Sequence, residues 1–197
     1  MLAKLKTALV LLIIGSIAGG LIYVVNEITA PIIAENELER KIGFYSEIFD
    51  VEQEIVYKDC TIDSEDLVPL EGQTESTFEL RDACPSGLTE TFIYDKVTEE
   101  LIGVVYFGSE KNSYGDVDVL VGINVDGTIA NVVISGSTNT PNFVKGIEKD
   151  YLSPFMGQMA DSELITFDSS TGASYTYGSV SDVVNDAIAA YNEGSDE

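Results

Sequence analysis

The sequence predicts an α+β fold, in which a single transmembrane helix precedes a compact sheet domain with helices packed on it. An uncharged apolar run near the N-terminus is long enough to span a bilayer. Short apolar or alternating runs, typical of strands, follow from residue 91, and the chain ends on an amphipathic helical stripe. We expect a cytoplasmic tip and anchor at 1–30, a juxtamembrane helix and acidic variable region at 31–89, and the sheet domain at 90–197.

The predicted anchor is Thr7–Val25, which has 19 residues and no charge. At about 1.5 Å per residue it extends about 28 Å, close to the hydrocarbon thickness of a bilayer. Lys4 and Lys6 precede the run and acidic residues follow it, so the positive-inside rule places the N-terminus in the cytoplasm and the remainder outside. A cleaved signal peptide is the alternative, but the run exceeds the usual apolar length and no small-residue cleavage site ends it.

The segment after the anchor is expected to stay close to the membrane. Pro31 should interrupt or kink the helix as it leaves the bilayer, and Ile33–Phe49 has an amphipathic helical pattern that can tether the domain. Residues 51–89 are acidic and irregular and include Cys60 and Cys84. In an oxidising compartment these cysteines can close a loop of about 25 residues, which stabilises by about 3 kcal/mol, and two free thiols are the alternative.

Composition excludes several classes of function. The chain has no histidine, so a Ser-His-Asp triad, Cys-His catalysis, His-ligated haem and most zinc sites are absent. Two cysteines are too few to hold an iron–sulfur cluster within the chain. Redox chemistry would therefore come from an organic cofactor. The net charge of −24 repels phosphate backbones, so we expect no nucleic-acid partner.

The sheet domain is predicted from alternating runs and turn signals. The expected strands are Thr91–Lys96, Leu101–Gly108, Val117–Val125, Thr128–Ser135 and Leu164–Phe167. Asp126-Gly127 is typical of a tight hairpin, and Val119, Val121, Ile123 and Val125 should share one face. A helix is expected at 142–156, and a capping box at Ser179–Asp182 should open the last helix. That helix has an apolar stripe formed by Val180, Val183, Val184, Ala187, Ile188 and Tyr191. No dinucleotide-binding fingerprint or P-loop is present.

The run Asp168-Ser169-Ser170-Thr171-Gly172-Ala173-Ser174 precedes this last helix. A phosphoester to a side chain requires a hydroxyl, which Ser174 provides, and Gly172 and Ala173 leave room for a bulky group. Helix N-termini offer unpaired N–H groups and a partial positive charge, which suit a phosphate. An ordinary small-residue loop before a helix is the alternative.

This run resembles the flavinylation motif in the FMN-binding domain of the G subunit of Rnf electron-transport complexes, a domain similar to that in the C subunit of the sodium-pumping NADH:quinone oxidoreductase. The resemblance implies that Ser174 forms a phosphoester with FMN and that 90–197 is the FMN-binding domain. It extends to Tyr114-Gly115, to the predicted hairpin VLVGINVDGTIANVVI, and to Thr140-Pro141. The chain departs from the family at Asn139, Asn142, Phe143 and Val144, where the family has Glu, Gly, Leu and Gly.

The resemblance also implies a set of residues around the flavin. Besides Ser174, the expected cofactor-binding residues are Asp168, Thr171, Gly172, Ala173, Tyr175, Thr176, Thr140, Pro141 and Phe143. Tyr175, Tyr177 and Phe143 are expected to stack on the isoalloxazine ring, although aromatic residues in a sheet domain are more often core. Thr138, in a second run of small and hydroxyl residues, is a weaker attachment site because no acid lies at the matching upstream position.

By this resemblance the chain is a membrane-anchored, extracytoplasmic flavoprotein. It would relay electrons in an Rnf-type ion-translocating ferredoxin:NAD⁺ oxidoreductase, with other membrane subunits as partners and a flavin transferase for maturation. The isolated chain should have no turnover. Two alternatives remain: an independent extracytoplasmic FMN electron-transfer protein and a cofactor-free, membrane-tethered binding module.

Overall fold

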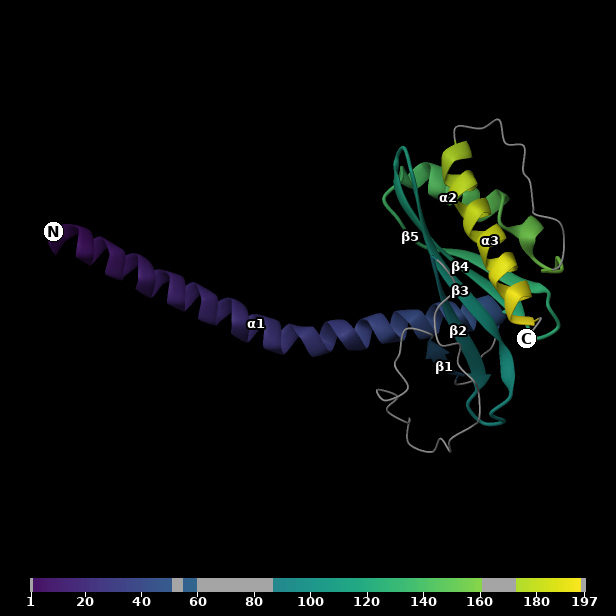
Figure 1. Ribbon diagram of the computed structural model, residues 1–197, viewed down its shortest axis with the longest axis horizontal. Helices are drawn as coiled ribbons and strands as arrows, with labels where there is room; N and C mark the ends of the chain where they lie inside the picture. Colours follow the sequence, from purple (N-terminus) through teal and green to yellow (C-terminus); the bar gives the residue numbers. More distant parts are fainter. Residues whose placement is uncertain (1, 51–54, 60–86, 161–172, 196–197) are drawn as a thin grey trace. The chain divides into compact units, whose positions relative to one another are not determined.

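The structure is a computed structural model that describes residues 2–50, 55–59, 87–160 and 173–195 (Figure 1). The chain divides into two units, residues 1–43 and residues 44–197. Most of the helix α1 (Leu2–Phe49) forms the first unit, and the second contains an antiparallel sheet with the helices α2 (Pro141–Asp150) and α3 (Ser174–Ser195). The predicted α+β class, an apolar N-terminal helix followed by a sheet with helices, is confirmed.

Helix α1 continues through Pro31, so of the two predicted effects of this proline, an interruption or a kink, the interruption is wrong. A proline removes one backbone donor and displaces the carbonyl four residues earlier, which here belongs to Glu27. Glu27 lies beyond the predicted span Thr7–Val25 and is exposed, so water can solvate the freed carbonyl. The cost of the missing hydrogen bond is therefore smaller there than it would be inside a bilayer.

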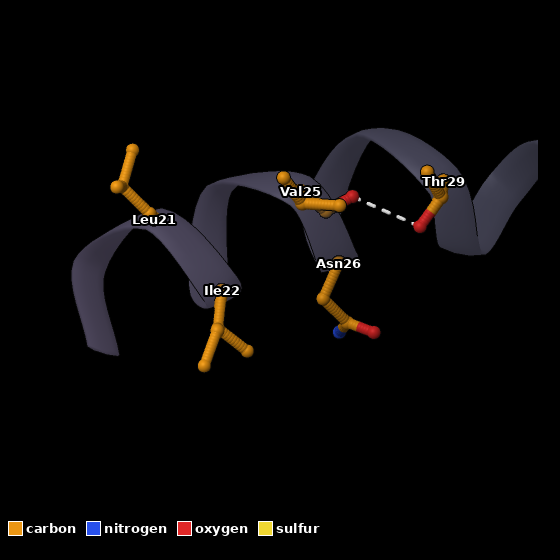
Figure 2. A pocket seen from close by; sticks show the side chains of 5 residues that line it. All are labelled: Leu21, Ile22, Val25, Asn26 and Thr29. Atoms are coloured by element: carbon orange, nitrogen blue, oxygen red, sulfur yellow. Dashed lines mark hydrogen bonds between the residues drawn. The ribbon is translucent and has the colours of Figure 1, made fainter. Parts of the chain in front are cut away.

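Among the described residues, one helix is long and apolar enough to cross a membrane, Ala8–Phe49, by its length and composition. None of its most apolar window is buried within the chain. Figure 2 shows one face of this helix, where Leu21, Ile22 and Val25 lie beside Asn26 and Thr29 along a shallow hollow. The Thr29 hydroxyl donates to the Val25 carbonyl at 2.9 Å, which satisfies it within the helix. These features agree with the predicted single-pass anchor.

The sheet is an antiparallel meander, in which strands adjacent in sequence are adjacent in space. Its strands are β1 (Ile55–Asp59), β2 (Leu88–Asp95), β3 (Leu101–Asn112), β4 (Gly115–Asn124) and β5 (Ile129–Ser137). β1 was not predicted. The predicted strand Leu164–Phe167 and the predicted disulfide of Cys60 and Cys84 lie outside the described residues.

The predicted β4–β5 turn is confirmed. The Asp126 carboxylate accepts hydrogen bonds from the Thr128 amide at 2.9 Å and from the Thr128 hydroxyl at 2.6 Å, and these hold its pKa below the usual value. Gly127 has a φ of +81°, which a residue with a side chain rarely adopts. Val125 lies in this turn and is exposed, so the prediction that it shares the buried face of β4 is wrong.

Helix α3 packs on one face of the sheet and forms the main core with it. The predicted stripe of α3 is buried at Val180, Val183, Val184, Ala187 and Ile188, and Tyr191 is partly buried. Tyr177 and Ala190, outside the predicted stripe, also join the core. The last turn of α1 covers the other face of the same unit. A Cβ on Gly122 would meet Ile48, and one on Gly103 would meet Phe49, so these glycines allow the helix end to approach the strands.

Two helix boundaries differ from the prediction. α2 ends at Asp150, and a short 3₁₀ turn, η1 (Ser153–Phe155), replaces the rest of the predicted helix 142–156 because Pro154 has no N–H to continue the α-helical pattern. α3 begins at Ser174 rather than at a capping box, so Ser179 is inside the helix. Its hydroxyl donates to the Tyr175 carbonyl at 3.2 Å, a bond typical of helix interiors.

Buried tyrosines should make the stability of the domain fall at high pH. Burial raises the pKa of Tyr94 and of Tyr177 to about 12, from an ordinary value of 10.0. Between about pH 10 and about pH 12 the unfolded chain releases these protons while the folded chain keeps them, so each tyrosine lowers the unfolding free energy by about 1.4 kcal/mol per pH unit. Urea denaturation at several pH values in this range measures how the unfolding free energy falls with pH. That fall should be less steep for Tyr177→Phe than for the wild type, and an equally steep fall would contradict the raised pKa of Tyr177.

Candidate functional site

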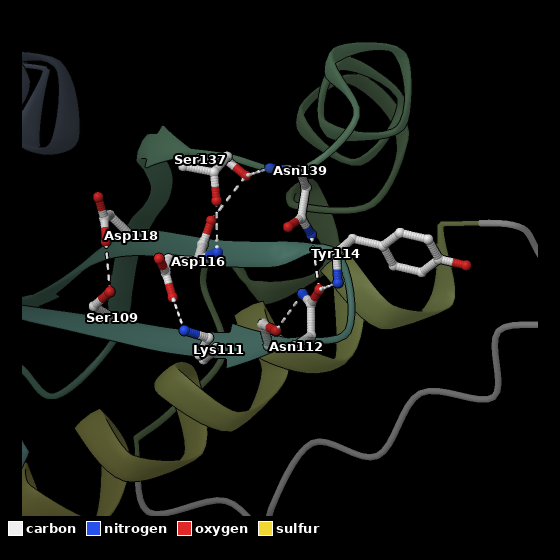
Figure 3. A network of polar contacts seen from close by, with 10 residues as sticks. Ser109, Lys111, Asn112, Tyr114, Asp116, Asp118, Ser137 and Asn139 are labelled. Carbon is white, nitrogen blue, oxygen red and sulfur yellow. Dashed lines mark hydrogen bonds and ion pairs between the residues drawn. The ribbon is translucent and has the colours of Figure 1, made fainter.

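Three segments far apart in the sequence meet at one end of the sheet (Figure 3). They are the β3–β4 turn, the connection that follows β5, and the first two turns of α3. The Asn139 amide donates to the Thr176 hydroxyl at 2.9 Å and to the Asn112 carbonyl oxygen Oδ1 at 3.3 Å. Asn139 is only 5% exposed, so this one side chain joins all three segments from a buried position.

Asn112 ties the β3–β4 turn to α3 directly. Its Nδ2 donates to the Ser179 hydroxyl at 2.9 Å and lies 3.4 Å from the Tyr175 carbonyl oxygen. Its Oδ1 accepts from the Tyr114 amide at 2.9 Å. The turn and the start of the helix are therefore held in register by one asparagine side chain.

Gly115 allows the connection after β5 to lie against this turn. Its φ is +135°, and a Cβ at this position would come within 2.1 Å of the Thr138 hydroxyl. That hydroxyl accepts a hydrogen bond from the Asp116 amide at 2.8 Å, and the Thr138 amide donates to the Asp116 carbonyl at 2.9 Å. Thr138, the weaker predicted attachment residue, thus has its hydroxyl engaged in joining the two strands.

The predicted attachment residue is at the start of a helix. Ser174 is the first residue of α3 and is partly buried, and Ala173 packs against the core. The Tyr177 amide donates to the Ala173 carbonyl at 3.0 Å. The first amides of a helix point out of its N-terminal end, and together with the helix dipole they give this end a partial positive charge. Asp168, Thr171 and Gly172 lie outside the described residues.

The second predicted group of site residues lies beside the first. Thr140 precedes α2, Pro141 is its first residue, and the Phe143 amide donates to the Thr140 carbonyl at 2.9 Å. The bond from Asn139 to Thr176 connects this segment to α3 across 37 residues of sequence. The Thr176 hydroxyl is buried and accepts this bond, so its predicted contact with the phosphate or the ring would use its remaining O–H donor.

Of the tyrosines near Ser174, one lies in the core and two lie on the surface. Tyr177 is buried and stacks on Phe155, with ring centroids 6.0 Å apart, so it is not available to a bound ring. Tyr175 is 56% exposed and makes an edge-to-face contact with Tyr114, which is 57% exposed, at a centroid distance of 5.5 Å. Tyr114 was not among the predicted site residues, although an exposed aromatic side chain in a two-residue hairpin turn is itself a signal.

A match to a known protein family overlaps this site. Residues 113–189 match the FMN-binding domain family. This range begins in the β3–β4 turn and ends inside α3, so it includes most of the three segments that meet.

The whole chain also has a curated relative. It is 26% identical over 198 residues to a protein of Acetobacterium woodii, the G subunit of the Na⁺-translocating ferredoxin:NAD⁺ oxidoreductase complex. The match covers 94% of this chain and 90% of the relative. Together with the domain match, it confirms the predicted resemblance to the G subunit of Rnf complexes.

The residues at this site fit the two ends of FMN. The N-terminal amides of α3 and the Ser174 side chain suit a phosphate. The exposed rings of Tyr114 and Tyr175 offer aromatic surface to a flat ring. Among the described residues, Asn139 Oδ1 is buried without a hydrogen-bond partner, so an acceptor is available there for a hydroxyl or N–H donor. In the described ranges no group of three or more acidic or cysteine side chains is placed to hold a metal ion.

Proposed function

We propose that the chain is the membrane-anchored flavoprotein subunit of an Rnf-type ion-translocating ferredoxin:NAD⁺ oxidoreductase, and that its FMN relays electrons. The observation that carries this proposal is the convergence at the start of α3, where Ser174 lies in a domain of the FMN-binding family. The similarity to the Rnf G subunit over nearly the whole chain supports the assignment to this type of complex. The cofactor supplies the redox chemistry when bound, and the chain binds and orients it.

The FMN is attached covalently to Ser174. A flavin transferase is the partner for this step, with FAD as the donor. The Ser174 oxygen attacks the phosphorus on the FMN side of the FAD anhydride, the bond to AMP breaks, and the serine proton leaves with AMP or a base. The products are the Ser174 phosphoester and AMP, with no change in oxidation state. Asp168 helps to position the attachment loop or contributes to recognition by the transferase, and Thr171 hydrogen-bonds the phosphate or the ring.

The anchor places this reaction at the membrane. Helix α1 spans the bilayer once, and the lysines before the apolar run keep the N-terminus in the cytoplasm. The FMN domain is therefore extracytoplasmic, where a covalent bond prevents loss of the cofactor. Other membrane subunits of the complex donate and accept the electrons, so the isolated chain has no turnover with NADH or ferredoxin.

Production of the full chain together with a flavin transferase tests this function. The detergent-purified protein should have flavin absorption that bleaches on chemical reduction and returns in air, and the colour should stay with the polypeptide in denaturant. In membranes that contain the other subunits, the chain should co-purify with them. A colourless protein, or a flavin that dialyses away, would contradict the proposal.

A further inference from the structure

Two exposed tyrosine rings lie together beside the proposed attachment residue. Tyr175 follows Ser174 directly in the first turn of α3. Figure 3 shows the Tyr114 side chain projecting from the β3–β4 turn, and its ring contacts that of Tyr175. More than half of each side chain is exposed. Their ring centroids are 5.5 Å apart and their planes meet at 66°, so the pair offers the face of one ring beside the edge of the other.

The backbone beneath both rings is fixed. Asn112 accepts from the Tyr114 amide and contacts the Tyr175 carbonyl, and the same side chain bonds to Ser179 one turn further along α3. Asn139 holds Asn112 from the buried side. The two tyrosines are therefore presented at set positions by a partly buried polar network, and a surface fixed in advance loses little entropy when a ring binds to it.

Two neighbouring aromatic rings on the surface leave apolar area in water, and covering that area is favourable. Flat aromatic ligands prefer offset-stacked or edge-to-face contacts with tyrosine, and this pair can provide both. A flavin ring that is tethered to Ser174 through its ribityl phosphate lies within reach of the neighbouring Tyr175 side chain. The occupant that fits this position is the isoalloxazine ring.

We propose that Tyr114 and Tyr175 form the surface on which the isoalloxazine ring of the FMN at Ser174 packs. Tyr114 is then a positioning and tuning residue of the cofactor. The inference rests on the proposed function, since it assumes that FMN is attached at Ser174. A phenol ring against the flavin quenches its fluorescence by electron transfer and disfavours the electron-rich reduced form, so the pair should lower the reduction potential.

The test uses the full chain flavinylated by coexpression with a flavin transferase. Tyr114→Leu and Tyr175→Leu should keep covalent FMN by intact mass, while flavin fluorescence rises several-fold, visible circular dichroism weakens and the midpoint potential increases. Tyr114→Trp should retain the quenching. Tyr191→Leu is the matched control because Tyr191 is 16 residues further along α3, about 24 Å away along the helix axis, and it should leave all three signals unchanged.

The outcomes separate this inference from the proposed function. Flavinylated Tyr114→Leu and Tyr175→Leu proteins with wild-type fluorescence, dichroism and potential would overturn the packing surface and leave attachment intact. Absence of covalent flavin from the wild-type chain would overturn the proposed function, and this inference with it. A change of the same size in Tyr191→Leu would also overturn the proposed packing surface, because the effect would then not depend on contact between the tyrosine ring and the flavin.

Discussion

Replacement of Ser174 with alanine should remove covalent FMN completely. An alanine side chain has no oxygen that can form a phosphoester, and the next aliphatic hydroxyl in the helix, that of Thr176, is buried and bonded to Asn139. The variant should purify without flavin absorption, and its intact mass should lack the mass of FMN less one water. Because Ser174 lies at the first position of α3, the helix and core should remain folded by circular dichroism.

Two control variants make this result specific. Ser174→Thr keeps a hydroxyl at the same position and should retain the flavin. Thr138→Ala removes the hydroxyl of the other hydroxyl-rich run, which accepts from the Asp116 amide, and should also retain it. Full flavinylation of Ser174→Ala, or its loss from Thr138→Ala alone, would place the attachment site at a residue other than Ser174.

The second large effect is on stability, at the aromatic pair beneath the start of α3. Phe155 in η1 is fully buried and stacks on Tyr177 at an interplanar angle of 17°. Phe155→Ala removes a large buried side chain and leaves a cavity, which typically lowers the unfolding free energy by about 3–5 kcal/mol. Denaturant titration of the full chain in detergent measures the change through the cooperative transition of the sheet domain.

Phe143→Ala is the matched control for this variant. Phe143 lies on α2 and is 41% exposed, so its truncation should lower the unfolding free energy by no more than about 1 kcal/mol. Equal losses in the two variants would mean that the Phe155–Tyr177 stack is not a central part of the core.

The sequence predicted those parts of the fold that depend on local pattern. The stripe from Val180 to Ile188 repeats with helical period, and Asp126-Gly127 has the turn chemistry of a hairpin, so both were identified without any knowledge of tertiary contacts. The start of α3 was mispredicted because Ser179 and Asp182 fit the capping-box spacing. In the structure the Ser179 hydroxyl instead bonds to Asn112, 67 residues earlier.

The candidate site was also predictable only in part, because its contacts join residues that are far apart in the sequence. The residues Thr140, Pro141 and Ser174 were identified from motifs, and the structure brings their segments together. The hydrogen bonds that hold these segments come from Asn139 and Asn112 and join residues 27 to 67 positions apart in the sequence. In the sequence alone, an asparagine near a turn is equally typical of a residue that only forms the turn. Tyr114 was missed because its contact with Tyr175 exists only after folding.

The most direct test of the account is peptide mapping of the chain purified from its native membranes. We predict that the peptide containing Ser174 has the added mass of FMN less one water, and that fragmentation places this mass on the Ser174 side chain. An unmodified Ser174 peptide, together with a flavin that is removed by denaturant or found on another residue, would contradict the account.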